Sequence, residues 1–458
     1  MLNRYQIEFF TNPKGETMET SALSLAKDLL QFIDASPTPF HVVREIKRRL
    51  DEAGFEELKE SDDWLLQKDG KYYVARGSSI IAFIGTAPVF EHGGFKIIGA
   101  HTDSPALKLK ANYAYNKAGY LQFGVEPYGG GIWRTWLDRD LYIAGRAVAC
   151  TPKGNLVSYL VELKDLVVSI PSLAIHLQRD VNENGSLNSQ TDIPCIVALD
   201  GVKNTDAFDQ QILSSCPLSY CKVISSSLSL CSAESGALAG LDQEFIRAGQ
   251  LDDLASCHEA ITALINTEKP LTTCVVSFWN HEEVGSQSAE GAGGTFLQEV
   301  LERIVEKTST KDLSTKSDFQ RAIAKSFCIS ADMAHAIHPN HPEKHDPHHS
   351  PRIGGGPVIK WNASQRYATN DHTAAIFARL CDIAGVKNQS FASRSDLPCG
   401  STIGPITSTG LSVSVVDVGI PMLAMHSIRE QCGVEDHFAM KKVFETFFSR
   451  GQEEIIEI

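Results

Sequence analysis

The chain has 458 residues, of which 43% are hydrophobic and 21% are charged. This composition excludes a disordered or fibrous protein and allows a large core shared by two domains. The formal net charge of -14 argues against nucleic acid as a partner, because phosphate binding requires Lys and Arg patches.

Neither a membrane nor an oxidising compartment is expected. No apolar run is long enough to cross a bilayer, and the first twenty residues lack the basic and apolar segments of a secretory leader. The 11 cysteines are scattered, without a CxxC pair. This pattern favours reduced thiols, so we expect a cytoplasmic protein.

The first hundred residues predict helices followed by strands. Apolar positions recur at helical spacing over residues 21–53, with a break at 36–39, which indicates two helices. Residues 71–84 are rich in β-branched and aromatic side chains and predict strands. Residues 95–100 form a short apolar strand that ends at His101.

The middle of the chain has a different character. From about residue 107 to about residue 239, short alternating segments are separated by turn signals such as Gly129-Gly130-Gly131. This region predicts a mainly-β insertion. We therefore expect one domain in two parts, residues 20–106 and 243–458, interrupted by this mainly-β insertion at 107–242.

Helices and strands alternate again after residue 243. The pattern predicts helices at 254–265, 296–306, 373–384 and 434–449, and strands at 272–279, 326–330 and 411–418. Such alternation is typical of an α/β fold with a mostly parallel central sheet. Functional sites in such sheets lie at the carboxyl ends of the strands.

Residues of metal-binding type follow these strands or precede a helix. Together they supply two imidazoles, three carboxylates and a spare carboxylate, which suits a two-metal hydrolytic site with borderline ions such as Zn²⁺. A single His or Asp at a strand end is usually a cap or a solvated turn, so the signal lies in the whole set at comparable positions. They are His101, Asp252 or Asp253, Glu282, Glu283, Asp332 and His426.

The pair Glu282-Glu283 suggests a division of roles, in which one carboxylate binds metal and the other takes a proton from water. The segment is not an HExxH helix, because Gly285 stands where the second His would be. The chain also has no GxSxG elbow, so serine hydrolase chemistry has no anchor.

Two further features keep alternative interpretations open. Asp103 either orients the His101 ring or caps the turn before Ser104-Pro105. Residues 335–349 contain six His, which suit either a metal-storage tract or a polar loop with only His335 near the site.

These segments resemble the aspartyl aminopeptidases, a family of zinc metallopeptidases, nearly end to end. The matching motifs include His101-Thr102-Asp103-Ser104-Pro105, Asn280-His281-Glu282-Glu283-Val284-Gly285-Ser286, Ser330-Ala331-Asp332-Met333-Ala334-His335 and Met425-His426-Ser427-Ile428-Arg429-Glu430. The resemblance implies one zinc on His101 and Asp332, another on Glu283 and His426, a bridge at Asp252 and a general base at Glu282. The family often has Asn where this chain has Asp253, which leaves the bridge open between Asp252 and Asp253.

The resemblance also implies a substrate pocket and an assembly. Lys360 would pair with an acidic substrate side chain, with Arg366 as a second candidate and His335 and Met425 nearby. The domain in two parts would be the catalytic domain, and the insertion would be an oligomerisation domain that makes dimers, which assemble into a tetrahedral dodecamer. His176 would reach a neighbouring subunit's active site, although from the residues alone it is an ordinary His on a β-face or in a loop.

We therefore expect a metalloaminopeptidase that removes N-terminal Asp or Glu from peptides through water activated by two Zn²⁺ per subunit, one exchangeable for another divalent metal. One alternative keeps the site but prefers neutral N-terminal residues. The other is a catalytically silent oligomeric scaffold, which would lack a ligand or the base, whereas this chain has the whole set.

Overall fold

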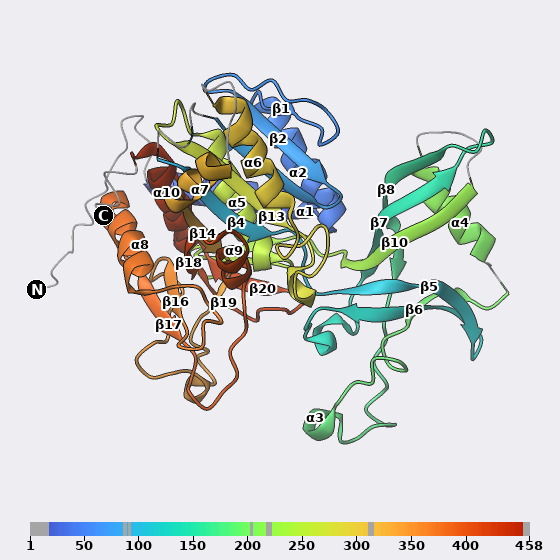
Figure 1. Cartoon of the computed structure of the whole chain (residues 1–458). Helices are drawn as coiled ribbons and strands as arrows, with labels where there is room; N and C mark the ends of the chain where they lie inside the picture. Colours follow the sequence, from blue (N-terminus) through green and yellow to red (C-terminus); the bar gives the residue numbers. More distant parts are fainter. Residues whose placement is uncertain are drawn as a thin grey trace, which may run out of the picture.

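The computed structural model of the chain describes residues 18–85, 89, 93–201, 205–216, 222–309 and 316–451. A body of helices packed on a mixed sheet carries a second, antiparallel sheet that projects from one side (Figure 1). Within these residues, no helix is both long enough and apolar enough to cross a membrane.

The sheet of the body has nine strands in the order β1-β2-β3-β13-β4-β14-β18-β16-β17. Its central strands β13, β4, β14 and β18 are parallel, whereas β3 and β16 run antiparallel to the central strands that they flank. This arrangement confirms the α/β prediction. The strand bounds are β1 (Glu56–Glu57), β2 (Lys71–Arg76), β3 (Ser79–Ile84), β4 (Phe95–His101), β13 (Thr273–Trp279), β14 (Phe327–Ala331), β16 (Val358–Trp361), β17 (Gln389–Ala392) and β18 (Ser414–Gly419).

Helices cover both faces of this sheet, so every residue of β4 and β13 is buried. Ile98 faces a core built with α1, α2, α5, α8 and α10, whereas its neighbour Ile97 faces a core built with α6, α7 and α9. The helix bounds are α1 (Met18–Asp34), α2 (Pro39–Glu52), α5 (Leu251–Ile265), α6 (Phe296–Thr308), α7 (Lys316–Ala324), α8 (Asp371–Ala384), α9 (Ile403–Leu411) and α10 (Val434–Ser449).

Two helices of the body differ from the sequence pattern. Helix α7 was not predicted, and α9 occupies a stretch that contains Gly404, Pro405 and Gly410. Glycine and proline lower helix propensity, but packing of Ile403 into the core under the sheet outweighs it. Strand β18 consequently begins at Ser414 rather than at residue 411.

A five-stranded sheet has the order β11-β12-β20-β19-β15. Its strands β15 and β19 follow the carboxyl ends of the central strands β14 and β18 within a few residues. Strand β12 leads into α5, and β19 and β20 form an antiparallel pair whose connection carries His426. The bounds are β11 (Ala237–Ala239), β12 (Phe245–Ala248), β15 (Ala334–His335), β19 (Pro421–Leu423) and β20 (Glu430–Gly433).

The projecting sheet is the mainly-β insertion predicted for the middle of the chain. Its strands pair antiparallel in the order β8-β7-β10-β5-β6-β9 and enclose an apolar core of their own that includes Phe123, Ile143 and Leu230. The sheet ends at Ser232, and the boundaries at 107 and 242 stay predictions. The bounds are β5 (Ala106–Lys117), β6 (Tyr120–Tyr128), β7 (Leu141–Cys150), β8 (Leu156–Val168), β9 (Cys195–Leu199), β10 (Lys222–Ser232), η1 (Trp133–Trp136), α3 (Val181–Asn184) and α4 (Thr205–Ser214).

Candidate metal centre

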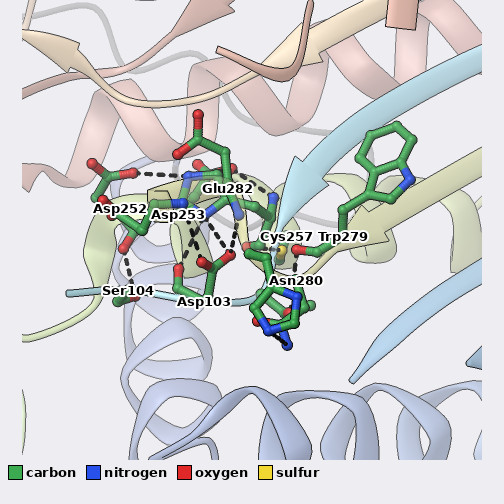
Figure 2. A network of polar contacts seen from close by, with 12 residues as sticks. Asp103, Ser104, Asp252, Asp253, Cys257, Trp279, Asn280 and Glu282 are labelled. Atoms are coloured by element: carbon green, nitrogen blue, oxygen red, sulfur yellow. Dashed lines mark hydrogen bonds and ion pairs between the residues drawn. The ribbon is translucent and has the colours of Figure 1, made fainter. Parts of the chain in front are cut away.

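Polar side chains gather where the central parallel strands end. His101 is the last residue of β4, the turn η2 (Glu282–Val284) follows β13, and Asp332 follows β14. Because β13, β4 and β14 are parallel neighbours, their carboxyl ends meet at one edge. The start of α5 adds Asp252 and Asp253 from the sequence that follows the insertion (Figure 2).

Two groups of metal-ligand type form there and share one carboxylate. One contains His101, Asp252, Asp253 and Asp332, and the other contains Asp252, Glu283 and His426. Asp252 Oδ1 lies 3.4 Å from His101 Nε2, and Asp252 Oδ2 lies 3.3 Å from His426 Nε2. Asp252 is thus the member common to both groups, and it directs one oxygen toward each.

Asp253 differs from Asp252 in what its carboxylate contacts. Its Oδ2 accepts a hydrogen bond of 3.1 Å from the main-chain N–H of His101, and it lies 3.9 Å from His101 Nε2. Asp253 belongs to the first group only. The choice between Asp252 and Asp253 as the shared carboxylate therefore falls on Asp252 in this geometry.

The donor set fits bound cations. Asp252 Oδ1, Asp253 Oδ1 and Glu283 Oε1 are buried without a hydrogen-bond partner. Burial, followed by the nearby charge of Asp252, raises the pKa of Glu283 well above its usual range. Burial alone would lower the pKa of His426, but Asp252 and Glu283 raise it to about 10. Such surplus negative charge in a buried site calls for cations, and imidazole with carboxylate oxygens suits Zn²⁺.

Glu282 lies beside the two groups and belongs to neither. His281 (φ 65°) and Gly285 (φ 95°) bracket its turn in left-handed conformations, which glycine tolerates at position 285. Burial, reinforced by Asp332, Asp103 and Asp252 against the opposing effect of His101, raises the pKa of Glu282 to about 7.

The Asp103 side chain is hydrogen-bonded to the backbone of this turn. Its carboxylate accepts hydrogen bonds from the main-chain N–H groups of Glu282 (3.1 Å) and Glu283 (3.2 Å). The His101 ring makes its short contact, 2.9 Å from Nδ1, with the main-chain oxygen of Asp103, while the carboxylate is 3.6 Å away. Asp103 therefore contacts His101 through its main-chain oxygen and the Glu282–Glu283 turn through its carboxylate.

A cavity of 650 Å³ opens over both groups, and the predicted pocket residues Lys360, His335, Arg366 and Met425 line it. Lys360 is only 3% exposed, and its Nζ lies 3.6 Å from Asp332 Oδ2. The Arg366 side chain is exposed. Of the His-rich segment, His335 is the member that lines this cavity, and within the described residues that segment forms no group of three metal-ligand type.

His176 is not part of this cavity. It lies in the inserted portion with an exposed side chain, between Ile175 (46% exposed) and Leu177 (75% exposed). Within one subunit the fold therefore does not bring His176 to the metal centre.

Two residues at the site were not singled out by sequence reasoning. Glu430, which is buried, accepts hydrogen bonds from the N–H of His426 (2.6 Å) and of Asp252 (3.1 Å). Tyr128 donates from its hydroxyl to Asp103 Oδ2 at 2.6 Å. Glu430 lies in a motif that carried the resemblance, whereas Tyr128 had no signal except its place before the three glycines.

Comparisons with known proteins identify the family of this chain. Residues 32–448 match the family described as Aminopeptidase I zinc metalloprotease (M18). A Pseudomonas aeruginosa (strain UCBPP-PA14) protein named "Probable M18 family aminopeptidase 2" is 44% identical over 434 residues, which cover 93% of this chain and 99% of the relative.

Solved structures show the same fold. A structure described as "Cryo-EM structure of the Ape4 and Nbr1 complex" has a TM-score of 0.90 and 38% identity, covering 96% of this chain and 89% of that chain. "Structure of S. cerevesiae mApe1 dodecamer" has a TM-score of 0.81 and 29% identity, covering 94% and 97%. With a family match over most of its length and this set of buried ligand-type side chains, the chain belongs to the M18 family of aminopeptidase I zinc metalloproteases.

Proposed function

We propose that this zinc aminopeptidase uses two Zn²⁺ per subunit to remove acidic residues, Asp or Glu, from the N-termini of peptides. One observation carries the two-metal part. Two groups of ligand type share Asp252, and both face a 650 Å³ cavity beside an unassigned carboxylate, Glu282.

His101 and Asp332 would hold one ion, Glu283 and His426 the other, and Asp252 would bridge them. Bound zinc supplies Lewis acidity, which polarises the scissile carbonyl and makes water nucleophilic at neutral pH. Glu282 takes the proton from the attacking water and delivers it to the amine that leaves when the C–N bond breaks. The raised pKa of Glu282, about 7, suits both halves of this transfer.

The base is tested with Glu282→Gln, which keeps the shape of the side chain. The expected result is a fall in kcat of about 10²–10⁴ with two zinc ions still bound. The exposed Glu343→Gln is the matched control. Turnover at the wild-type level with both ions bound would show that Glu282 is not the base.

Lys360 would select the acidic side chain, since it is a buried cation on the cavity wall. A substrate carboxylate enters such a site readily only when a cation meets it there. Arg366, exposed at the same cavity, is the second candidate. These two cations would supply local positive charge for an acidic substrate, although the net charge of the whole protein is -14.

A second specificity has an observation in its favour. Lys360 Nζ lies 3.6 Å from Asp332 Oδ2, so part of its charge is already neutralised inside the protein. If Asp332 neutralises the Lys360 charge completely, the pocket would accept a neutral N-terminal residue such as Leu instead.

One assay distinguishes acidic from neutral specificity. It measures hydrolysis of matched N-terminal amides of Asp, Glu, Leu, Ala and Arg, with and without a chelator. Acidic specificity predicts that Lys360→Met selectively abolishes Asp and Glu hydrolysis. The exposed Lys344→Met is the control. Chelator-sensitive activity that is highest on Leu and insensitive to Lys360→Met would establish the neutral alternative.

The protein would act as a homo-oligomer in which dimers build a tetrahedral dodecamer and His176 enters a neighbour's active site. The related mApe1 structure from S. cerevesiae is described as a dodecamer. In this chain, Leu173 (56% exposed), Ile175 and Leu177 (75% exposed) form an apolar surface around His176 that another subunit could cover. Free thiols throughout the described cysteines fit a cytoplasmic location.

Mixed oligomers test this arrangement. A His176→Ala subunit lacks the donated imidazole, and a Glu282→Gln subunit lacks its own base, so each variant alone is expected to be nearly inactive. Co-assembly should restore part of the activity, because some sites combine an intact base with an intact donated His176. Light scattering gives the oligomeric mass. No recovery in mixed dodecamers would exclude a donated His176.

A further inference from the structure

A segment of the inserted portion, residues 128–135, passes directly along the second group of ligand type, Asp252, Glu283 and His426. It begins at the end of β6, which projects from the body together with β5 (Figure 1). Its first residue, Tyr128, donates to Asp103, whose carboxylate in turn accepts the N–H groups of Glu282 and Glu283. The segment thus holds the turn that carries Glu283.

The same segment holds His426 on two sides. The ring Nδ1 donates to the main-chain oxygen of Gly130 at 3.0 Å, and the N–H of Ile132 donates to the main-chain oxygen of His426 at 2.9 Å. A proton fixed on Nδ1 leaves Nε2 as the free ligand atom, and Nε2 lies 3.3 Å from both Asp252 and Glu283. His426 also has a φ of 67°, a conformation that its surroundings must maintain.

Gly129 brings the backbone of the segment against Glu283. Its φ is +74°, and a Cβ placed there would lie 3.1 Å from Glu283 Cβ and 3.3 Å from Glu283 Oε2. A side chain would therefore push on the ligand itself. Close backbone approach to a functional group is one of the uses of glycine.

We propose that residues 128–135 of the inserted portion are a positioning element for the second metal position, with Tyr128 and Gly129 as its key residues. The inference rests on the proposed two-zinc function. The segment contacts Glu283, His426 and the Asp103 carboxylate, which accepts the N–H groups of Glu282 and Glu283. Asp103 makes its short contact with His101 through the main-chain oxygen, so the effect of the segment should fall on the second ion and spare the ion held by His101 and Asp332. The insertion would thereby contribute to the active site of its own subunit as well as to assembly.

The experiment is zinc titration of metal-free protein against a competing chelator, combined with steady-state kinetics. Tyr128→Phe removes one hydroxyl, and Gly129→Ala adds one methyl. Each substitution should lower the affinity for the second ion by about 10–100-fold and leave the affinity for the first ion unchanged. At saturating zinc, kcat should fall while KM changes little, because the turn carrying Glu282 is displaced rather than the substrate pocket.

The opposite end of β6 offers matched controls. Tyr120, at the other end of β6, is 41% exposed, and Gly119 has a φ of +86° with nothing within 4 Å of a Cβ placed there. Tyr120→Phe and Gly119→Ala therefore reproduce each chemical change away from the site. Both should bind two ions as the wild type does.

The outcomes distinguish the positioning role from the two-zinc function on which it rests. A wild-type protein that binds fewer than two ions would overturn the proposed function itself. Two ions in the wild type, with unchanged affinities in Tyr128→Phe, would overturn only the positioning role. An equal loss of affinity for both ions would also overturn the positioning role, because the substitution would then disturb the whole metal centre. If Gly129→Ala does not fold, Tyr128→Phe alone decides.

Discussion

A hydrogen-bond chain through buried histidines joins helices α1, α5 and α10. His258 Nε2 contacts Asp28 Oδ2 at 2.8 Å, His258 Nδ1 contacts His437 Nε2 at 3.1 Å, and His437 Nδ1 contacts Glu259 Oε1 at 2.7 Å. His258, His437 and Glu259 are all buried. The order of donors and acceptors along this chain yields a prediction about Glu259.

The order of donors and acceptors is set at Asp28, which is paired with Arg49 and accepts a hydrogen bond from His258 Nε2. His258 Nδ1 must then accept from His437 Nε2, which leaves His437 Nδ1 as an acceptor for Glu259. Burial, together with the charges of Asp253 and Asp436, raises the pKa of Glu259 well above its usual range, so a protonated carboxyl can donate. Burial also lowers the pKa of His437 well below its usual range.

The perturbation is Glu259→Gln, compared with Glu259→Met. Glutamine supplies an amide N–H to His437 Nδ1, so the chain stays complete. Methionine has a similar volume but no donor, and an unpartnered buried acceptor costs about 1–3 kcal/mol. Glu259→Met should therefore be less stable than Glu259→Gln by that amount, measured by urea unfolding at fixed protein concentration.

The pH dependence has a definite sign. A carboxyl whose pKa is raised on folding contributes stability below its unfolded value, near 4.5, and loses that contribution as pH rises toward the folded pKa. Glutamine does not titrate. The stability of Glu259→Gln relative to wild type should thus increase by about 1.4 kcal/mol per pH unit between pH 4.5 and the folded pKa of Glu259, and level off above it. Equal stability of the two variants, or a difference that is flat with pH, would refute the directional chain.

Three other variants have outcomes set by the contacts of the altered residue. Lys96→Met should lower the free energy of unfolding by about 2–4 kcal/mol, because a buried ammonium now serves main-chain oxygens at the end of α10. Burial, with two nearby cations, lowers the pKa of His41 to about 3. Its stabilising contribution is therefore present above pH 6.5 and is lost as pH falls toward 3, so urea titrations of His41→Gln should show a shallower acid destabilisation. Glu430→Gln loses one of its two acceptor oxygens for the N–H groups of His426 and Asp252, so chelator competition should show at least about 10-fold weaker zinc binding.

Local sequence pattern was sufficient for the elements that bear the site. Strand β4 ending at His101, β13 before Glu282 and β14 before Asp332 are short apolar runs, and a buried parallel strand needs little else to be recognised. Propensity misjudged α9, because Gly404 and Pro405 argue against a helix that core packing stabilises.

Pairwise geometry across the site depended on tertiary structure. Neighbouring residues Asp252 and Asp253 are chemically identical, and only the arrangement around them makes Asp252 the shared carboxylate. The contacts of Tyr128 with Asp103 and of Glu430 with Asp252 join residues 25 and 178 positions apart, which no helical or strand period relates.

The sequence by itself therefore determined the class of fold, the mainly-β insertion and the set of residues at the strand ends, because these follow from composition, hydrophobic period and motif. The tertiary structure decided which carboxylate is shared, which backbone groups hold His426 and Glu283, and that His176 lies away from its own subunit's cavity. The physical reason is that hydrophobic pattern acts locally along the chain, whereas hydrogen-bond partners and close approaches arise only when distant segments pack together.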